Sequence, residues 1–170
     1  MTGVRALPEP ALLSAGFRSL MAAFPAGVCV VTGLDADGQP RGMTCSSVCS
    51  VALEPPTLLV CLRTASPTLT AVLGCARFAV NMLHDRAQLT AELFSSGEPD
   101  RFQRVRWLGA GDGIPHLVDD AHSVADCVVI AAHQVGDHTV VYGEVFGVAV
   151  QPAPQPLLYG LRRYAAWPRH

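Results

Sequence analysis

The chain of 170 residues is long enough for a single domain with a buried core. Half of its residues are hydrophobic and only 15% are charged, which favours an oligomer, because a monomer this apolar would expose large apolar patches. The net charge is −2, and no basic stripe alternates with aromatic residues, so nucleic-acid binding is not expected. No apolar run is long enough to span a membrane and no signal-type segment is apparent, so we expect a cytoplasmic protein.

Residues 1–11 are expected to form a loose N-terminal arm, followed by a helix over 12–24 that Pro25 ends. The helix assignment rests on apolar residues at helical spacing. The next third of the chain reads as a meander of strands joined by short turns. These strands are predicted over 27–34, 43–53 and 57–62.

The second half begins with a short helix after Ser66, a favoured N-cap, and Pro67, a favoured first helical residue. A strand, a second short helix and an irregular glycine-rich connection follow, over 77–83, 86–96 and 97–115. The β-branched runs 123–135 and 138–150 predict a long hairpin, and the tail is less regular. The fold class is therefore mainly β (α+β), a small antiparallel barrel with short flanking helices in one domain.

The strand predicted over 43–53 carries an unusual mixture of hydroxyls and thiols. With side chains alternating between faces, Thr44, Ser46 and Ser50 share one face, while Cys45 and Ser47 share the other. One face can contact a polar ligand or a partner subunit, or the hydroxyls can simply satisfy backbone groups at strand ends.

The six cysteines offer no C-x-x-C motif and no paired Cys/His spacing, so we expect small buried hydrophobes in a reducing compartment and no metal site. Cys49 and Cys61 are interpreted as core filler.

Two further features could bind a phosphate-bearing, planar ligand. The first turn of the helix after Ser66 presents free backbone N–H groups, with Thr68 and Arg63 close by, although many helices begin with Ser-Pro. Near the end of the chain, Tyr159 and Arg162 belong to a Tyr/Arg cluster that suits stacking and bidentate contacts, or that is a solvated face.

His138 sits beside the Gly136-Asp137 turn and is either functional or simply exposed. The sequence has no G-x-G-x-x-G, G-x-S-x-G or H-E-x-x-H motif, so a dinucleotide fold, a hydrolase and a zinc protease are all disfavoured.

The order of motifs resembles the flavin reductase-like family of split-barrel flavoproteins. The opening segment 17–69 carries the resemblance, followed by "RFAVNML", "DRFQRVRW", "GDHTVVYGEV" and "PLLY". The resemblance implies a six-stranded antiparallel split barrel that works as a homodimer. It further implies an NAD(P)H-dependent flavin reductase that supplies reduced FAD or FMN to a separate monooxygenase.

The resemblance also implies site residues. Flavin contacts are expected from Arg41, Gly42, Met43, Thr44, Cys45, Ser46, Ser47, Cys61, Leu62, Arg63, Ser66, Thr68, Phe94, Ser95, Arg101 and Phe102. Phe94, Ser95, Arg101 and Phe102 match a segment that closes over the flavin. The pyridine nucleotide is expected at His138, Tyr159, Gly160, Leu161 and Arg162. By its position in this segment, Cys45 is the thiol that the resemblance places nearest the flavin. Cys45 stands where small apolar residues are usual, and Arg101 where Lys is usual.

Hydride transfer between stacked rings needs position more than an acid or base, so His138 is expected to place the nicotinamide rather than to move a proton. FAD and NADH are favoured over FMN and NADPH on association alone. Two alternatives stay open: a flavin-binding protein for storage or sensing, and a split-barrel oxidase acting on a bound organic substrate.

Overall fold

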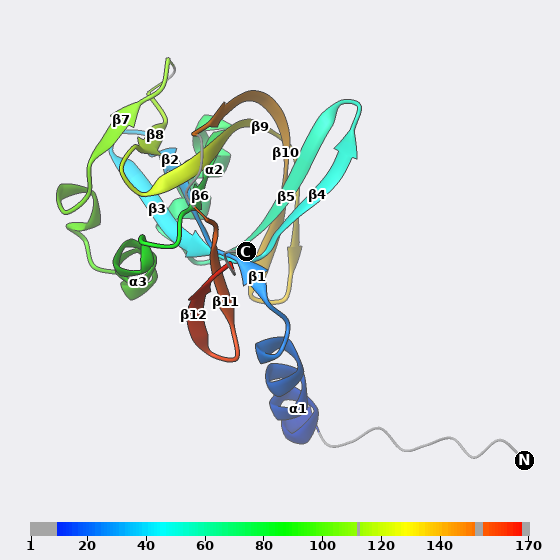
Figure 1. The fold of residues 1–170 in the computed structure, drawn as a ribbon. Coiled ribbons are helices and arrows are strands. Elements are labelled where there is room, and N and C mark those ends of the chain that lie inside the picture. Colours follow the sequence, from blue (N-terminus) through cyan, green and yellow to red (C-terminus); the bar gives the residue numbers. More distant parts are fainter. Residues whose placement is uncertain (1–9, 112, 152–154, 168–170) are drawn as a thin grey trace, which may run out of the picture.

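The computed structural model describes residues 10–111, 113–151 and 155–167 (Figure 1). Its helical elements are α1 (Pro10–Ala22), α2 (Pro67–Cys75), α3 (Gln88–Ser96) and the short 3-10 helix η1 (Arg101–Gln103). The strands of the first half are β1 (Ala26–Gly27), β2 (Cys29–Leu34), β3 (Pro40–Cys45), β4 (Val48–Leu53), β5 (Pro56–Arg63) and β6 (Arg77–Leu83). Those of the second half are β7 (Trp107–Gly109), β8 (Pro115–Leu117), β9 (Ala121–Val135), β10 (His138–Val150), β11 (Leu157–Gly160) and β12 (Arg163–Ala166).

The main sheet is antiparallel and has the order β3-β2-β6-β9-β10-β5-β4. It curls so that its two ends approach: β3 contacts β5, and the thiol of Cys45 at the end of β3 donates to the carbonyl of Cys61 on β5 at 3.7 Å. The ladders among the described residues do not join β3 to β4, so backbone pairing does not close this sheet. The predicted mainly β, antiparallel class is confirmed, but the sheet has seven strands and the six-stranded barrel is not confirmed.

The buried strand β2 explains why the sheet has two cores. Val31 belongs to a cluster inside the curled sheet, while its neighbour Val30 points to a second cluster on the other face. Helix α2 packs on β2, β3 and β5, and its Val72 enters the first cluster. Helix α3 packs on β2 and β3, and its Phe94 enters the second. Strands β2 and β3 thus separate the two helices that border the site described below.

Two local predictions differ from the structure. The strand predicted over 43–53 is broken after Cys45, and β4 restarts at Val48 on the far edge of the sheet. The break follows from tertiary pairing, since Ser47 pairs with Cys61 instead of continuing the β2 ladder. As a result, Thr44 and Ser50 do not line one continuous strand face.

The segments predicted to be irregular contain two small hairpins. Strands β7 and β8 pair within the glycine-rich connection, and β11 pairs with both β1 and β12 in the tail. The long hairpin is confirmed as β9 and β10, with Gly136 in the left-handed region at φ +59°. Residues 1–9 of the expected arm lie outside the described residues, and the expected helix begins at Pro10.

Helix α1 stands clear of the sheets (Figure 1). Its apolar side chains are exposed, with Phe17 and Leu20 more than 60% accessible (62% and 65%). None of the helices in the described part of the chain is long and apolar enough to cross a membrane.

Candidate functional site

The start of helix α2 is built as the sequence predicts. Ser66 is the N-cap, with an extended backbone, and its side chain accepts a hydrogen bond from the amide of Leu69 at 3.1 Å. Pro67 occupies the first turn. Thr68 is 2% exposed, and no hydrogen bond to its hydroxyl is found within the described residues. First-turn amides without intrahelical acceptors and the positive end of the helix dipole make this position suitable for an anion.

A cavity of about 300 Å³ opens at this helix start and joins residues from β3, β5, α2, α3 and η1. Eight residues predicted to contact flavin line it together: Met43, Thr44, Arg63, Ser66, Thr68, Phe94, Ser95 and Arg101. Pro67 and Gly97 complete the lining. Residues scattered over 59 positions of sequence therefore converge on one concave site, which has hydroxyls and an arginine at its anion end.

Arg101 supplies positive charge beside the helix start. Its guanidinium donates to the carbonyl of Phe94 at 3.2 Å and lies over the Phe94 ring, 5.8 Å from the centroid. Burial, and then the nearby charge of Arg41, lower the pKa of Arg101. The neighbourhood of two guanidinium groups makes this region of the site attractive to a phosphate.

Two residues predicted to contact the flavin, Gly42 and Phe102, do not line the cavity but pack against Phe94, which does. An added Cβ at Gly42 would lie 3.0 Å from Phe94 and 3.1 Å from Phe102, so the two rings pack directly on this strand. Phe102 was expected to close over the flavin, but it packs edge-on between Phe94 and Trp107, with centroids 5.1 and 5.9 Å away. It does not line the cavity, because η1 turns this ring into the second core cluster.

The inner strand residues face the core. Cys45 and Leu62 are buried in the first cluster, and the thiol of Cys45 donates to the carbonyl of Cys61 at 3.7 Å. The amide of Cys61 is already bonded to Ser47. The expectation that Cys45 is the thiol nearest the ligand is not supported by its side chain, which points into the core.

A second cavity, of about 590 Å³, adjoins the first, since Thr44 and Ser95 line both. It brings Ser46 together with two residues predicted for the pyridine nucleotide, Tyr159 and Arg162. Its other lining residues are Val28, Gln88, Glu92, Arg163 and Tyr164. The structure therefore places the Tyr/Arg tail against the predicted flavin strand.

Gln88 and Glu92 in this second cavity were missed by sequence reasoning. They lie four residues apart on α3, and Gln88 Nε2 donates to Glu92 Oε1 at 2.8 Å. That spacing was the available signal, but it is equally typical of any solvated helix face.

The tip of the β11–β12 hairpin has unusual backbone geometry. Leu161 and Arg162 both have positive φ, 52° and 60°, in a two-residue turn that usually contains Asn or Gly. Gly160 packs against Pro25, 3.2 Å from an added Cβ, and Leu161 is exposed. Of the predicted nucleotide residues in this hairpin, Tyr159 and Arg162 line the cavity, whereas Gly160 and Leu161 do not.

His138 lies at a different edge of the site. It pairs across the sheet with Arg63, which lines the first cavity, and its Nδ1 is 2.8 Å from Asp137 Oδ1. The hydrogen bond and the charge of His138 lower the pKa of Asp137. His138 does not line the cavity that contains Tyr159 and Arg162, so a single chain does not unite the predicted nicotinamide contacts.

The thiols divide into three groups by exposure, and Cys61, interpreted as core filler, is only partly buried. Cys29, Cys45 and Cys127 are buried, and burial, followed by the nearby Asp126 charge, raises the pKa of Cys127 to about 12. Cys49 and Cys75 are exposed, so the interpretation of Cys49 as core filler is wrong for the single chain. No cluster of three or more potential metal ligands occurs among residues 10–111, 113–151 and 155–167.

Together, the curled antiparallel sheet and the two adjoining cavities, which gather hydroxyls, arginines and tyrosines, are suited to a planar ligand that carries a phosphate. Residues 21–168 match the family described as "Flavin reductase like domain". The chain belongs to this flavin reductase-like family.

Curated relatives are similar over most of their length. The chain is 51% identical over 161 residues to "Flavin reductase (NADPH)" of Lentzea aerocolonigenes, covering 94% of each chain. It is 46% identical over 154 residues to "Flavin reductase (NADH)" of Kitasatospora aureofaciens, covering 89% of this chain and 81% of the relative. Among solved structures, nitrilotriacetate monooxygenase component B from Mycobacterium thermoresistibile superposes with a TM-score of 0.87 at 34% identity, over 93% of this chain and 88% of that one.

Proposed function

We propose that this protein is an NAD(P)H:flavin oxidoreductase that reduces FAD or FMN and supplies the reduced flavin to a separate monooxygenase. The observation that carries the proposal is the convergence of eight predicted flavin residues on one cavity at the start of α2. The relatives named as flavin reductases support it. One is named for NADPH and the other for NADH, and the preference of this chain for NADH and FAD is part of the proposal.

The residues of the site fit a flavin phosphate at the anion end. The N-terminal turn of α2 and the buried Thr68, whose hydroxyl has no bond within the described part of the chain, would receive the phosphate oxygens. Arg101 would add charge-assisted hydrogen bonds. Met43 and Thr44 on β3 would border the ring system, and the Thr44 hydroxyl is itself oriented by its 2.6 Å bond to the Ala91 carbonyl.

A bound flavin supplies the two-electron acceptor chemistry that no side chain of the protein provides. The contribution of the protein is then to hold the donor and the acceptor face to face and to exclude water. In this arrangement Tyr159 and Arg162 would hold the pyridine nucleotide in the second cavity, and His138 would position its nicotinamide from the Arg63 edge. No acid or base is needed for the transfer.

We further propose that the working form is a homodimer. The exposed apolar side chains of α1 support this, and so does the separation of His138 from Tyr159, because a second copy offers a way to bring such edges together. We interpret the curled sheet as the split barrel of the family, with six of its strands forming the barrel wall.

The decisive experiment is steady-state oxidation of NADH and NADPH under air with FAD, FMN or no added flavin. We expect turnover that rises with the concentration of free flavin and is negligible without it. Flavin binding without NAD(P)H oxidation would support storage or sensing instead. Oxygen consumption that requires an organic substrate but no nicotinamide would support an oxidase. Either result overturns the proposed function.

A further inference from the structure

Strands β2 and β3 bring two cysteines face to face in the core. Cys29 and Cys45 are directly opposite each other in the antiparallel register, so their side chains leave the ladder on the same face. Both belong to the first core cluster and are 3% and 5% exposed. Neither lines the two cavities assigned to the flavin and the pyridine nucleotide, so the proposed function leaves this pair of thiols without a role.

The separation of the two positions suits a covalent bond. Residues directly opposite in an antiparallel pair have Cα atoms about 4.5–5.5 Å apart, and disulfides join Cα atoms about 4.4–6.8 Å apart. The Cys29 thiol already lies against β3, since it donates to the Cys45 carbonyl at 3.1 Å. In the ladders of the described residues, no other two cysteines oppose each other.

The two thiols differ in acidity, as a nucleophile and its resolving partner do. A hydrogen bond from the Cys29 side chain lowers the pKa of Cys45, although burial opposes this shift. The same interaction and burial raise the pKa of Cys29. Because the thiolate is the reactive form of cysteine, Cys45 is the thiol that reacts first. Cys127 is a contrast in the same cluster, since burial raises its pKa to about 12 and it faces no cysteine.

A third cavity, of about 500 Å³, leads a small oxidant to this pair. Cys29 lines it, and so does Ser46, which follows Cys45 in the chain. Most of its other lining residues are apolar, and hydrogen peroxide carries no charge that would be costly to bury there. The proposed activity supplies this oxidant, because free reduced flavin passes two electrons to O2 when no monooxygenase consumes it.

We propose that Cys29 and Cys45 form a reversible disulfide when hydrogen peroxide accumulates, and that this bond weakens flavin binding. The Cys45 thiolate attacks one peroxide oxygen, the O–O bond breaks and hydroxide leaves, so Cys45 becomes a sulfenic acid. The Cys29 sulfur then attacks the Cys45 sulfur, and the sulfenic oxygen leaves as water with the Cys29 proton. In sum, two thiols lose two electrons and two protons, and one peroxide becomes two waters.

The position of Cys45 explains why the bond would alter the flavin site. Met43 and Thr44 immediately precede it on β3 and line the cavity at the start of α2. The Cys45 thiol donates to the Cys61 carbonyl on β5, and a disulfide to Cys29 removes this donor and holds the end of β3 against β2. This effect rests on the proposed function, whereas formation of the bond rests on the thiols alone.

The test exposes the reduced, folded protein to hydrogen peroxide, blocks the remaining thiols with an alkylating reagent and maps the peptides by mass spectrometry. We expect a crosslinked peptide pair that contains Cys29 and Cys45. Flavin titration of the same sample should show affinity weakened at least about fivefold. Dithiothreitol should reverse both changes, because it reduces disulfides by thiol exchange.

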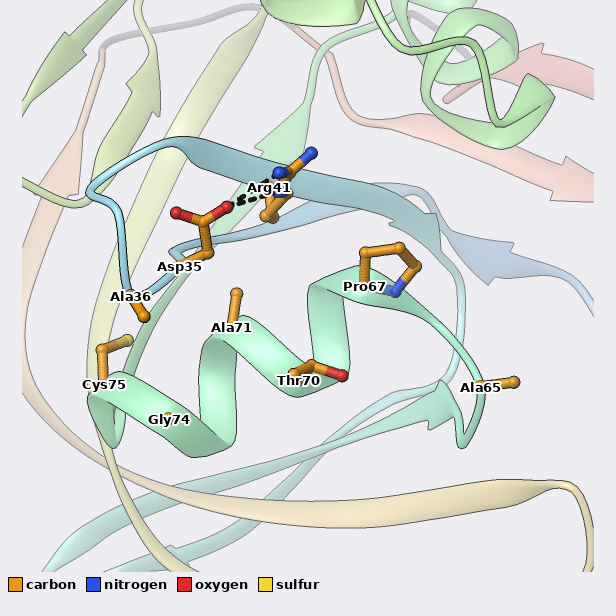
Figure 2. A pocket seen from close by; sticks show the side chains of 9 residues that line it. All are labelled: Asp35, Ala36, Arg41, Ala65, Pro67, Thr70, Ala71, Gly74 and Cys75. Carbon is orange, nitrogen blue, oxygen red and sulfur yellow. Dashed lines mark hydrogen bonds and ion pairs between the residues drawn. The ribbon is translucent and has the colours of Figure 1, made fainter.

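Three variants control for the identity of the thiols. Cys29→Ala should bind flavin equally before and after peroxide, and Cys29→Ser serves the same purpose if the alanine variant does not fold. Cys127→Ala is the matched buried control, since Cys127 faces Phe78 and Val145 in the same cluster. Cys75→Ala removes an exposed thiol at the end of α2 (Figure 2). Both controls should retain the crosslink and the loss of flavin affinity.

The outcomes separate this inference from the proposed function. A crosslink that is absent while exposed Cys49 and Cys75 are oxidised, or that forms only in urea, overturns the disulfide. A crosslink with unchanged flavin affinity, or an equal loss of affinity in Cys29→Ala, overturns its effect on the site. If the reduced protein binds no flavin, the proposed function fails and the effect on binding fails with it, but the crosslink still decides whether the disulfide forms.

Turnover provides a second test of the oxidant. Under air, NADH and flavin without a monooxygenase should produce the same crosslink, and catalase should prevent it. A crosslink that accumulates equally with catalase overturns peroxide as the oxidant.

Discussion

His138 is held at the edge of the site by its bond to Asp137 and by pairing with Arg63, not by burial. If it positions the nicotinamide, His138→Ala should raise the apparent KM for NAD(P)H about tenfold and change kcat little, because the lost contact is made equally in the ground and transition states. Steady-state kinetics with varied nicotinamide at saturating flavin measure both constants.

The matched control for that experiment is His133→Ala, which removes an exposed imidazole from the same hairpin. Its KM should equal that of the unaltered protein. A fall in kcat with an unchanged KM in His138→Ala would show that the imidazole acts in the transition state, contrary to the role assigned here.

Gly42 is the residue on which the aromatic wall of the cavity at the start of α2 depends. An added Cβ would lie 3.0 Å from Phe94 and 3.1 Å from Phe102, and both rings are locked by further aromatic contacts. Gly42→Ala should therefore lower the free energy of unfolding by about 1–3 kcal/mol, as overpacking does, and should weaken flavin binding through displacement of Phe94. Urea denaturation and flavin titration measure the two effects.

Gly27→Ala provides the comparison for Gly42→Ala, since an added Cβ at Gly27 has no atom within 4 Å. It should leave both stability and flavin affinity within experimental error. Unchanged stability in Gly42→Ala would mean that the two rings can shift without cost, and would refute the packing argument.

At the scale of elements, helix α2 combines a structural role and a binding role in its N-cap. Ser66→Ala removes the acceptor for the Leu69 amide and should cost about 1 kcal/mol of stability. Because the proposed phosphate site is also there, FMN binding should weaken several-fold while riboflavin, which lacks the phosphate, should bind as before. Calorimetric titration with both flavins measures the difference.

Ser96→Ala is the control for Ser66→Ala, because the Ser96 hydroxyl donates to the Leu93 carbonyl on another helix and Ser96 does not line the cavity at the start of α2. An equal weakening of FMN and riboflavin by Ser66→Ala would indicate a loss of helix structure rather than of a phosphate contact.

Elements with strong local signals were predicted well from the sequence. Ser66 and Pro67 mark the start of α2, and Gly136 marks the turn of the long hairpin, because cap and turn chemistry act within a few residues. The break between β3 and β4 was not predictable, since Ser46 and Ser47 are not strand breakers and the break depends on β3 pairing with β2 while β4 pairs with β5. The β11–β12 turn was missed because Leu161 and Arg162 lack turn chemistry.

Prediction of the candidate site was limited in the same way, because the direction of a side chain depends on segments that are far apart in the sequence. Motif resemblance selected residues that line the cavity at the start of α2, such as Met43, Thr68 and Arg101. It did not distinguish these from residues one or two positions away, such as Phe102, whose side chain enters the core. Which side of a short helix faces a cavity is decided by packing, and packing is set by segments far apart in sequence.

At the scale of the whole molecule, the low content of charged residues corresponds to exposed apolar side chains on helix α1 and at the ends of two strands. Helix α1 exposes Phe17 and Leu20, and the distal ends of β4 and β10 expose Leu53 and Val150 (83% and 70%). A helix that stands clear of its own sheets (Figure 1) buries little of its apolar surface within one chain. Such surface is typical of subunit interfaces.

The proposed homodimer therefore predicts that α1 contributes to the interface. The double variant Phe17→Glu/Leu20→Glu should raise the dimer dissociation constant at least about 30-fold, equivalent to about 2 kcal/mol, because it places charges in an apolar contact. Analytical ultracentrifugation over a range of concentrations measures this, with Ser19→Glu as the control, because Ser19 is exposed and points away from the apolar face of the same helix. If the unaltered protein sediments as a monomer at micromolar concentration, or if the double variant remains as dimeric as the control, α1 is not the dimer contact.

If α1 is the contact, the double variant should also raise the KM for NAD(P)H, because assembly would be needed to bring the edges marked by His138 and Tyr159 together.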